Sequence, residues 1–130
     1  MKKVVDVIAK LGKKLVLIER LSFPFGLALS GGKVEDKERP IRAAKREFTE
    51  ETGLTLRTIR FYARTEGKSR DPRGPTKSRV YIGVAEGIPK NENGKTRVVL
   101  LSVSKVLSLP LDRFAFDHGK ILQRALTASK

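Results

Sequence analysis

Apolar runs alternate with short polar turns along the first part of the chain. Val4 to Ala9 and Leu15 to Ile18 are rich in aliphatic residues, and a polar segment centred on Gly12 separates them. Two such runs around a glycine-containing turn predict a β-hairpin. We therefore expect the first two strands to be antiparallel neighbours.

Turn-forming residues mark the next segment. Phe23-Pro24-Phe25-Gly26 predicts a turn-rich approach to a short strand at Leu27-Ala28-Leu29. This strand is expected to stop at Ser30-Gly31-Gly32, because serine and glycine favour turns. Phe23 and Phe25 carry rings on which a base could stack, but we expect both to pack in the core or in the turn.

The period of the apolar positions changes between Pro40 and Thr52. Ile41, Ala44 and Phe48 recur at the spacing of one helix face, and Gly53 supplies a natural stop. Proline suits the first turn of a helix, because its missing N–H is not needed there. We expect this segment to be the first helix, with its apolar face towards the core.

The rest of the chain returns to strand-like patterns and then to a second helix. The expected strands are Leu56 to Arg64, Arg79 to Ala85 and Arg97 to Val103, with a loop from Gly67 to Ser78. Asp117 can cap a last helix whose apolar stripe is Ile121, Leu122, Ala125 and Leu126. Mixed strands flanked by two helices predict an α/β sandwich, formed as one domain over residues 1–130.

Composition limits the classes of protein that remain. Hydrophobic residues make up 39% of the chain, and the absence of cysteine excludes disulfides, thiolate metal sites and a cysteine nucleophile. No apolar run approaches the roughly 18 residues that a membrane span needs. We expect a cytoplasmic protein with no membrane partner.

The charges are numerous and unevenly placed. The formal net charge of +14 attracts anions, and the segment from Arg57 to Arg79 is strongly basic. A solvated surface explains any single one of these charges, but an acidic cluster beside a basic stretch suits a cation-assisted site for a polyanionic substrate. The cluster contains six of the fourteen acids, Glu35, Asp36, Glu38, Glu47, Glu50 and Glu51.

Three glutamates share one side of the expected first helix. Glu47, Glu50 and Glu51 are spaced i, i+3 and i+4, so their carboxylates can converge on one cation. An ordinary charged face is the alternative, but negative charge in the last turn opposes the helix dipole by about 0.3–1 kcal/mol per residue. A bound Mg²⁺ or Mn²⁺ would remove the repulsion, and oxygen ligands favour these hard cations.

A longer motif contains these glutamates. The spacing of Gly32, Glu38 and the segment Arg46 to Leu54 resembles the Nudix box at every specified position. The resemblance implies the family's α/β/α sandwich with a mixed β-sheet. It also implies a metal-dependent pyrophosphohydrolase that cleaves a nucleoside diphosphate linked to another group.

Carried over by position, the resemblance assigns a metal site and a base. Glu47, Glu50 and Glu51 would ligate Mg²⁺, and the backbone at Gly32 would approach it. Glu51 or Glu47 would accept the proton of the attacking water. Two alternatives for this base lie outside the motif, Glu86 and Glu92.

The resemblance also assigns residues that support the metal site or contact the substrate. Arg46 would orient a glutamate of the motif through a salt bridge, and Glu38 and Gly31 would lie near the substrate. Ser30 stands where many relatives have proline. His118 is the only histidine, and we expect it to pack or cap at the start of the last helix rather than act as a catalyst.

Two further segments resemble the ADP-ribose pyrophosphatases of this family. They are Arg70 to Gly74 with the strand that follows, and Phe116 to Leu122. The resemblance implies hydrolysis of ADP-ribose to AMP and ribose 5-phosphate, with Arg70 or Arg73 near the substrate phosphates, directly or across a homodimer. A plain turn also explains the first segment. The segment Asn91 to Arg97 departs from these enzymes, because it lacks their strongly acidic character.

Two alternatives to this function remain. One keeps the enzyme but changes the substrate to nucleoside triphosphates, dinucleoside polyphosphates or RNA 5′ ends. The other is a Nudix-fold module without turnover that binds nucleic acid through its charge. The intact set of mutually repelling glutamates favours the enzyme. Nucleic acid is not the favoured partner, because the sequence has no aromatic-studded segment of the kind that single-strand binders use.

Overall fold

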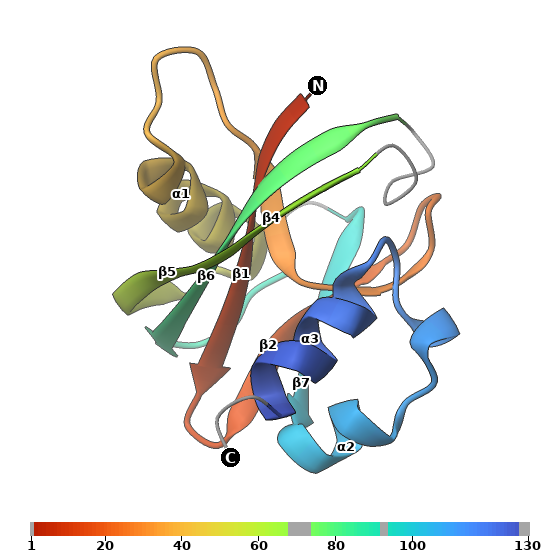
Figure 1. Cartoon of the computed structure of the whole chain (residues 1–130). Helices are drawn as coiled ribbons and strands as arrows, with labels where there is room; N and C mark the ends of the chain where they lie inside the picture. The colour runs from red at the N-terminus through yellow and green to blue at the C-terminus, as the bar shows by residue number, and fades with distance from the viewer. Residues whose placement is uncertain (1, 68–73, 92–93, 128–130) are drawn as a thin grey trace.

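The fold is described from a computed structural model, which covers residues 2–67, 74–91 and 94–127. Strands occupy the middle of the molecule, with α1 on one side and α2 and α3 on the other (Figure 1). This arrangement confirms the predicted α/β/α sandwich. Among the described residues, no helix is both long and apolar enough to cross a membrane.

The central strand is β1 (Lys2–Leu11), which belongs to a mixed sheet. It pairs in parallel with β6 (Thr76–Glu86) from Lys2 to Lys10, and β6 pairs antiparallel with β5 (Thr55–Gly67). Residues directly opposite each other on paired strands point to the same face of a sheet. The register therefore decides which side chains of β1, β6 and β5 lie together.

The other edge of β1 is shared by two strands. β4 (Ser30–Lys33) pairs with its first half, and β2 (Lys14–Arg20) pairs with its last residues, both antiparallel. β2 continues beyond β1 and pairs with β3 (Gly26–Ala28) and β7 (Thr96–Ser102). β4, β1, β6 and β5 thus form one group of strands, and β3, β2 and β7 form the other. The two groups diverge where the pairing partner of β1 changes from β4 to β2.

Each layer of helices packs on its own hydrophobic cluster. α1 (Pro40–Thr52) buries Ala43, Ala44 and Phe48 against one face of β1 and β6. The opposite face packs against α2 (Val103–Ser108) and α3 (His118–Thr127), which follow β7 and the short 3₁₀ helix η1 (Leu111–Arg113). The alternation of side chains along β1 produces this division, with Val5 and Val7 facing α1 and Ile8 facing α3.

Most of the predicted elements are confirmed. The hairpin of β1 and β2 forms as expected, and α1 has the predicted bounds, ending at Gly53 with φ 73°. The left-handed conformation at Gly53 explains why glycine ends the helix, since other residues adopt it at a cost. The last helix begins after Asp117 and buries Ile121 and Leu122 as predicted.

Three expectations were wrong. Ser30-Gly31-Gly32 is not a turn but strand β4, because β1 supplies the backbone partners that the local sequence does not reveal. Val103, expected at the end of a strand, begins α2, whose first turn is capped by the side chain of Ser102. The loop expected up to Ser78 ends earlier, because β6 begins at Thr76.

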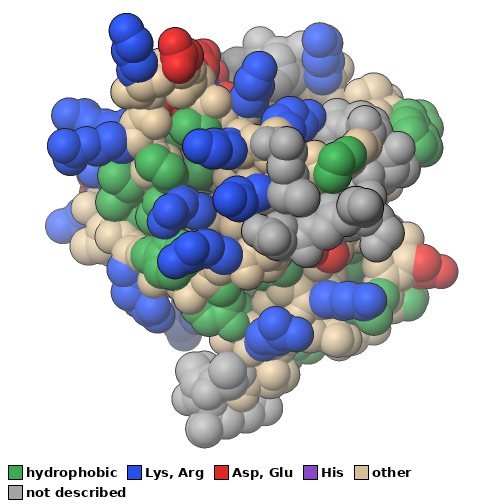
Figure 2. Space-filling model, turned by 45° about the horizontal axis from the view of Figure 1, so that its top comes forward, with side chains coloured by type: hydrophobic (Ala, Val, Ile, Leu, Met, Phe, Trp, Pro, Cys, Tyr) green, Lys and Arg blue, Asp and Glu red, His purple; other side chains and the backbone are tan. Residues whose placement is uncertain are grey.

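The surface is dominated by positive charge. Figure 2 shows lysine and arginine side chains spread over one face, with few acidic groups among them. The formal net charge of +14 is therefore visible as a basic surface. The acids of the motif gather around α1, which is where the candidate site lies.

Candidate active site

The two glycines of the motif lie where β4 touches α1. The register pairs Gly32 with Val5 and Gly31 with Asp6. A β-carbon on Gly32 would lie 2.3 Å from Cδ of Glu47, and one on Gly31 would lie 2.0 Å from the carbonyl oxygen of Val5. At Gly31 the backbone leaves no room for a side chain, whereas at Gly32 the end of Glu47 would have to move, so the two glycines allow the helix and the strand to approach this closely.

Glu51 points from the last turn of α1 at this strand. Its Oε1 accepts a hydrogen bond from the hydroxyl of Ser30 at 2.8 Å and from the backbone N–H of Gly31 at 3.0 Å. Burial raises the pKa of Glu51 to about 7, because desolvation outweighs these two hydrogen bonds. The carboxyl group therefore changes its charge in the neutral range.

Arg46 connects the other acids of the motif. Its guanidinium donates two hydrogen bonds to Glu38, from Nε at 2.8 Å and from Nη2 at 2.9 Å, and one to Glu47 from Nη1 at 2.9 Å. Nη2 also donates to the carbonyl of Lys33 at 3.1 Å. This arginine thus ties α1 to the segment between β4 and α1.

The charge of Arg46 acts differently on its two close partners. Its hydrogen bonds lower the pKa of Glu38 to about 2, and those with Glu38 raise the pKa of Arg46 itself. Burial raises the pKa of Glu47, although the hydrogen bond and the charge of Arg46 oppose the rise. Glu38 is therefore ionised under all physiological conditions, whereas desolvation dominates at Glu47.

Glu50 is the outermost of the three helix glutamates. Its side chain is 59% exposed, and an oxygen lies 3.4 Å from Nη1 of Arg46. In the part of the chain that the structure describes, no group of three histidine, cysteine or acidic side chains is gathered closely enough to hold a metal ion. Glu47 and Glu50 both lie within reach of Arg46, and ligation of a metal by the three glutamates stays a prediction.

A pocket of about 250 Å³ opens beside Glu51. Its walls come from both groups of strands and from the residues just before and at the start of α3, and Gly31 and Gly32 form part of them. Arg20 lines the pocket, and its guanidinium lies 5.3 Å from the ring centre of Phe116. Cationic groups in a pocket suit a negatively charged ligand, and a buried carboxyl beside them can exchange a proton during a reaction of that ligand.

A family model of the NUDIX domain matches residues 2–125 of the chain. The chain belongs to the Nudix family. It is 34% identical over 122 residues to the ADP-ribose pyrophosphatase of Methanocaldococcus jannaschii, a match that covers 92% of this chain and 69% of that protein. The chain is therefore a Nudix pyrophosphohydrolase, and enzymes of this family typically use divalent metals.

Solved structures of Nudix proteins share the fold. The NUDIX domain of Shewanella oneidensis NrtR, in complex with ADP ribose, is 21% identical with a TM-score of 0.86, covering 100% of this chain and 89% of that one. The MutT NUDIX hydrolase from Burkholderia pseudomallei is 20% identical with a TM-score of 0.81, covering 97% and 98%. At these identities the likeness establishes the fold of the Nudix chain.

A buried polar network that the sequence did not predict lies under the Nudix pocket. Nδ1 of His118 accepts a hydrogen bond from the backbone N–H of Leu29 at 2.9 Å, and Nε2 lies 3.3 Å from Oδ1 of Asp6. The hydroxyl of Ser78 donates to Oδ2 of Asp6 at 2.5 Å. The network joins β1, β6 and α3 directly behind Gly31. Its sequence signal was Asp6, a lone acid inside an apolar strand.

The expectation of structural packing for His118 is confirmed. Its side chain is 3% exposed and occupies the first position of α3. Phe23 and Phe25, which were expected to pack, are instead 64% and 66% exposed. Their turn carries them away from both hydrophobic clusters.

The remaining candidates lie away from the pocket or outside the described residues. Glu86 is on β6, where its side chain is 56% exposed and 3.4 Å from Arg57. Arg70, Arg73 and Glu92 fall outside the described residues. Ser30, a residue noted only as a departure from relatives, emerges as the side-chain partner of Glu51.

Proposed function

We propose that this Nudix enzyme hydrolyses ADP-ribose to AMP and ribose 5-phosphate. The name of the Methanocaldococcus relative, at 34% identity, supports this substrate, as does the ADP ribose in the complex of the NrtR domain. Within the chain, the observation that carries the proposal is the buried carboxyl of Glu51 at the wall of a pocket that also presents Arg20. Binding of a diphosphate needs cationic groups, and its hydrolysis by water needs a proton acceptor.

The metal in this proposal is Mg²⁺ or Mn²⁺. Glu47, Glu50, Glu51 and the carbonyl of Gly32 would hold it, and this donor set fits, because carboxylates and a carbonyl are hard oxygen ligands. The close approach of Glu47 to Gly32 brings two of the donor residues together. Glu47 could keep the hydrogen bond from Arg46 at Oε1 and offer Oε2 to the cation, whereas Glu50 would have to turn away from Arg46 to complete the set. When bound, the cation would neutralise charge on the diphosphate and acidify water.

Glu51 is the residue that we propose accepts the proton of the attacking water, with Glu47 as the alternative. A base is most effective when its pKa lies near the working pH, and the pKa of Glu51 is raised to about 7. Both of its hydrogen bonds end at Oε1. Oε2 is therefore the atom to which we assign the proton.

Five other residues would orient the substrate or the acids in this proposal. Arg46 would hold Glu47 and Glu38 in place through the hydrogen bonds described above. Glu38 and Gly31 would lie near the bound nucleotide. Arg70 and Arg73 would contact the phosphates, a role that follows from their resemblance to the ADP-ribose branch.

A substrate panel tests the proposal. The purified chain would be assayed with Mg²⁺ on ADP-ribose, nucleotide sugars, dinucleoside polyphosphates and nucleoside triphosphates, with products separated by chromatography. We expect ADP-ribose to give the highest kcat/KM, and chelation of the metal to abolish turnover. Exclusive hydrolysis of triphosphates would contradict the substrate assignment.

A matched pair of variants tests the site itself. Glu51→Gln is expected to abolish hydrolysis of ADP-ribose, whereas Glu86→Gln changes an exposed glutamate outside the pocket and should leave it intact. Equal losses in both variants would contradict the assignment of Glu51.

A further inference from the structure

Four cationic side chains lie together on the α1 side of the mixed sheet. Strand pairing places Lys3 beside Lys77 and Arg79 beside Arg64, and Lys77 and Arg79 alternate to the same face of β6. All four side chains are exposed. We call these residues, together with Phe61, the basic patch.

The described side chains around these charges do not neutralise them. Among the side chains that the structure describes, no carboxylate forms an ion pair with Lys3, Arg64, Lys77 or Arg79. Arg57, on the same strand as Arg64, does have such a partner in Glu86. Like charges opposite each other on paired strands destabilise a sheet. An anion bound across the patch would relieve this repulsion.

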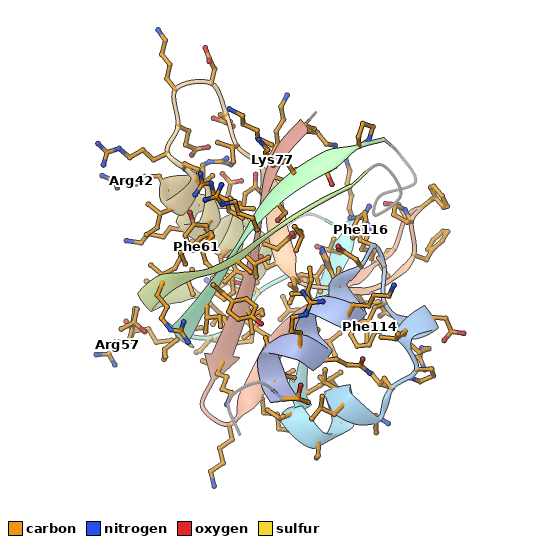
Figure 3. All side chains as sticks on the ribbon, in the orientation of Figure 1. Arg42, Arg57, Phe61, Lys77, Phe114 and Phe116 are labelled. Atoms are coloured by element: carbon orange, nitrogen blue, oxygen red, sulfur yellow. The ribbon has the colours of Figure 1, made fainter. Side chains whose placement is uncertain are left out.

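An exposed aromatic ring lies within the basic patch. Phe61 is 44% exposed, its edge contacts Tyr81 with ring centres 5.9 Å apart, and Cζ of Arg79 lies 5.8 Å from its ring centre. Figure 3 shows Phe61 and Lys77 on the neighbouring strands β5 and β6. An exposed ring beside Arg79 offers a stacking surface to a nucleic-acid base, and the neighbouring cations can pair with the phosphates of the nucleic acid.

We propose that the basic patch binds single-stranded nucleic acid, with phosphates on its four cations and an unpaired base on Phe61. A duplex fits the patch less well, because its bases are already stacked and cannot cover the ring. The patch lies outside the pocket, since none of its five residues lines that pocket. This binding is therefore an activity beyond the hydrolysis of a small nucleotide.

Fluorescence anisotropy with a labelled single-stranded RNA of twelve nucleotides tests the proposal. The logarithm of affinity should fall against the logarithm of salt concentration with a slope of about −0.7 per phosphate contact, or about −3 for four contacts. A Lys77→Glu/Arg79→Glu variant should weaken binding by about tenfold or more at moderate salt, since two contacts are lost and two repulsions added.

The matched control changes the same number of charges elsewhere. Lys13, in the turn after β1, and Lys14, the first residue of β2, are exposed at the opposite end of β1 from Lys3. Lys13→Glu/Lys14→Glu should lower the affinity much less than the patch variant. Equal losses would overturn the proposal, because they would mean that net charge rather than the basic patch attracts RNA.

A third variant separates stacking from charge. Phe61→Leu keeps every charge, and we expect it to weaken single-stranded RNA binding by about fivefold or more while leaving binding of inorganic polyphosphate unchanged. Preference for duplex RNA over the single strand, or an unchanged affinity in Phe61→Leu, would overturn the proposal. Both patch variants should retain nucleotide hydrolysis and the far-ultraviolet circular dichroism of the original chain, so that loss of folding is distinguished from loss of contact.

Discussion

Glu47 and Glu51 are one helical turn apart on α1, yet their carboxylates have different surroundings. Glu47 accepts a hydrogen bond from the guanidinium of Arg46, which also binds Glu38. The hydrogen bonds to Glu51 come from two neutral donors, the hydroxyl of Ser30 and the N–H of Gly31. The same face of α1 thus carries Glu47, which is beside a cation, and Glu51, which accepts hydrogen bonds from neutral groups.

A positive partner lowers the pKa of a carboxylate only where burial is slight, since burial raises the pKa of Glu47 as well although Arg46 donates to it. The pKa of Glu38, held by two hydrogen bonds from Arg46, is lowered to about 2, whereas burial raises the pKa of Glu51 to about 7. Neutral donors favour the ionised form too weakly to offset the loss of water. Burial rather than the absence of a cation therefore gives Glu51, on the strand side of the site, a pKa of about 7.

The largest expected effect comes from Glu51→Gln, which removes the titrating member of this comparison. If Glu51 is the base, kcat for ADP-ribose should fall by about 10²–10⁴-fold. The glutamine keeps the shape of the side chain, and its oxygen can still accept from Ser30. Steady-state kinetics at pH 8 would check this, and a loss confined to KM would contradict the role.

The same variant should be more stable than the original chain at high pH. The pKa of Glu51 rises from 4.5 to about 7 on folding, so the folded state binds the proton more tightly than the unfolded state. Stability of the metal-free protein therefore falls as pH rises from about 4.5 to 7. Glu51→Gln removes this penalty and should gain stability at pH 8, on the order of 3 kcal/mol at most.

Urea unfolding in the presence of a chelator would measure this gain. The difference between the two proteins should disappear near pH 4, where Glu51 is protonated in both states. Glu50→Gln provides the control, because the Glu50 side chain is 59% exposed and should contribute little. A pH-independent difference would contradict the raised pKa.

The second effect concerns Arg46, the cation beside Glu47 and Glu38. Arg46→Met should lower kcat by about 10–100-fold and weaken Mg²⁺ binding, because Glu38 and Glu47 lose the donor that fixes them. Arg42→Met changes an exposed arginine on the same helix and serves as the control. Activity assays across a range of Mg²⁺ concentrations would separate the two variants. Similar behaviour of both would show that Arg46 acts only through net charge.

The two glycines should respond differently to alanine. In Gly32→Ala the new β-carbon meets the flexible end of Glu47, which can move, so activity should fall by about tenfold while stability changes by less than about 1 kcal/mol. In Gly31→Ala the new β-carbon meets the backbone of Val5, which cannot yield, so stability should fall by about 1–3 kcal/mol. Thermal unfolding and kinetics of both variants would show whether the two effects separate in this way.

The smallest effect is expected for Ser30→Ala. Loss of one hydrogen bond of about 1 kcal/mol to the ionised carboxyl should raise the pKa of Glu51 further and lower activity by about threefold near pH 7. The acidic limb of the pH profile should move to higher pH, and the difference should shrink above pH 8. Ser104→Ala, which changes an exposed serine of α2, is the control and should leave the profile in place.

The sequence predicted the elements whose signals are local. The spacing of Ile41, Ala44 and Phe48 and the stop at Gly53 sufficed for the bounds of α1. The same periodicity placed Glu47, Glu50 and Glu51 on one side, because a helix has a fixed number of residues per turn. β4 was missed for the opposite reason, since its partner β1 is more than twenty residues away and its own glycines indicate a turn.

Residue types and their spacing along the chain thus determined the family motif, the rotation of α1 and the positive charge of this protein. The tertiary structure decided which acid received a cation and which received neutral donors. Ser30 lies 21 positions from Glu51, and Ser78 lies 72 positions from Asp6. The tertiary structure also placed four cations on one face of the sheet through the registers of β1, β6 and β5, namely Lys3, Arg64, Lys77 and Arg79. Hydrogen bonds, burial and the pKa values that follow from them depend on distance in space, which strand pairing sets and which sequence separation does not report.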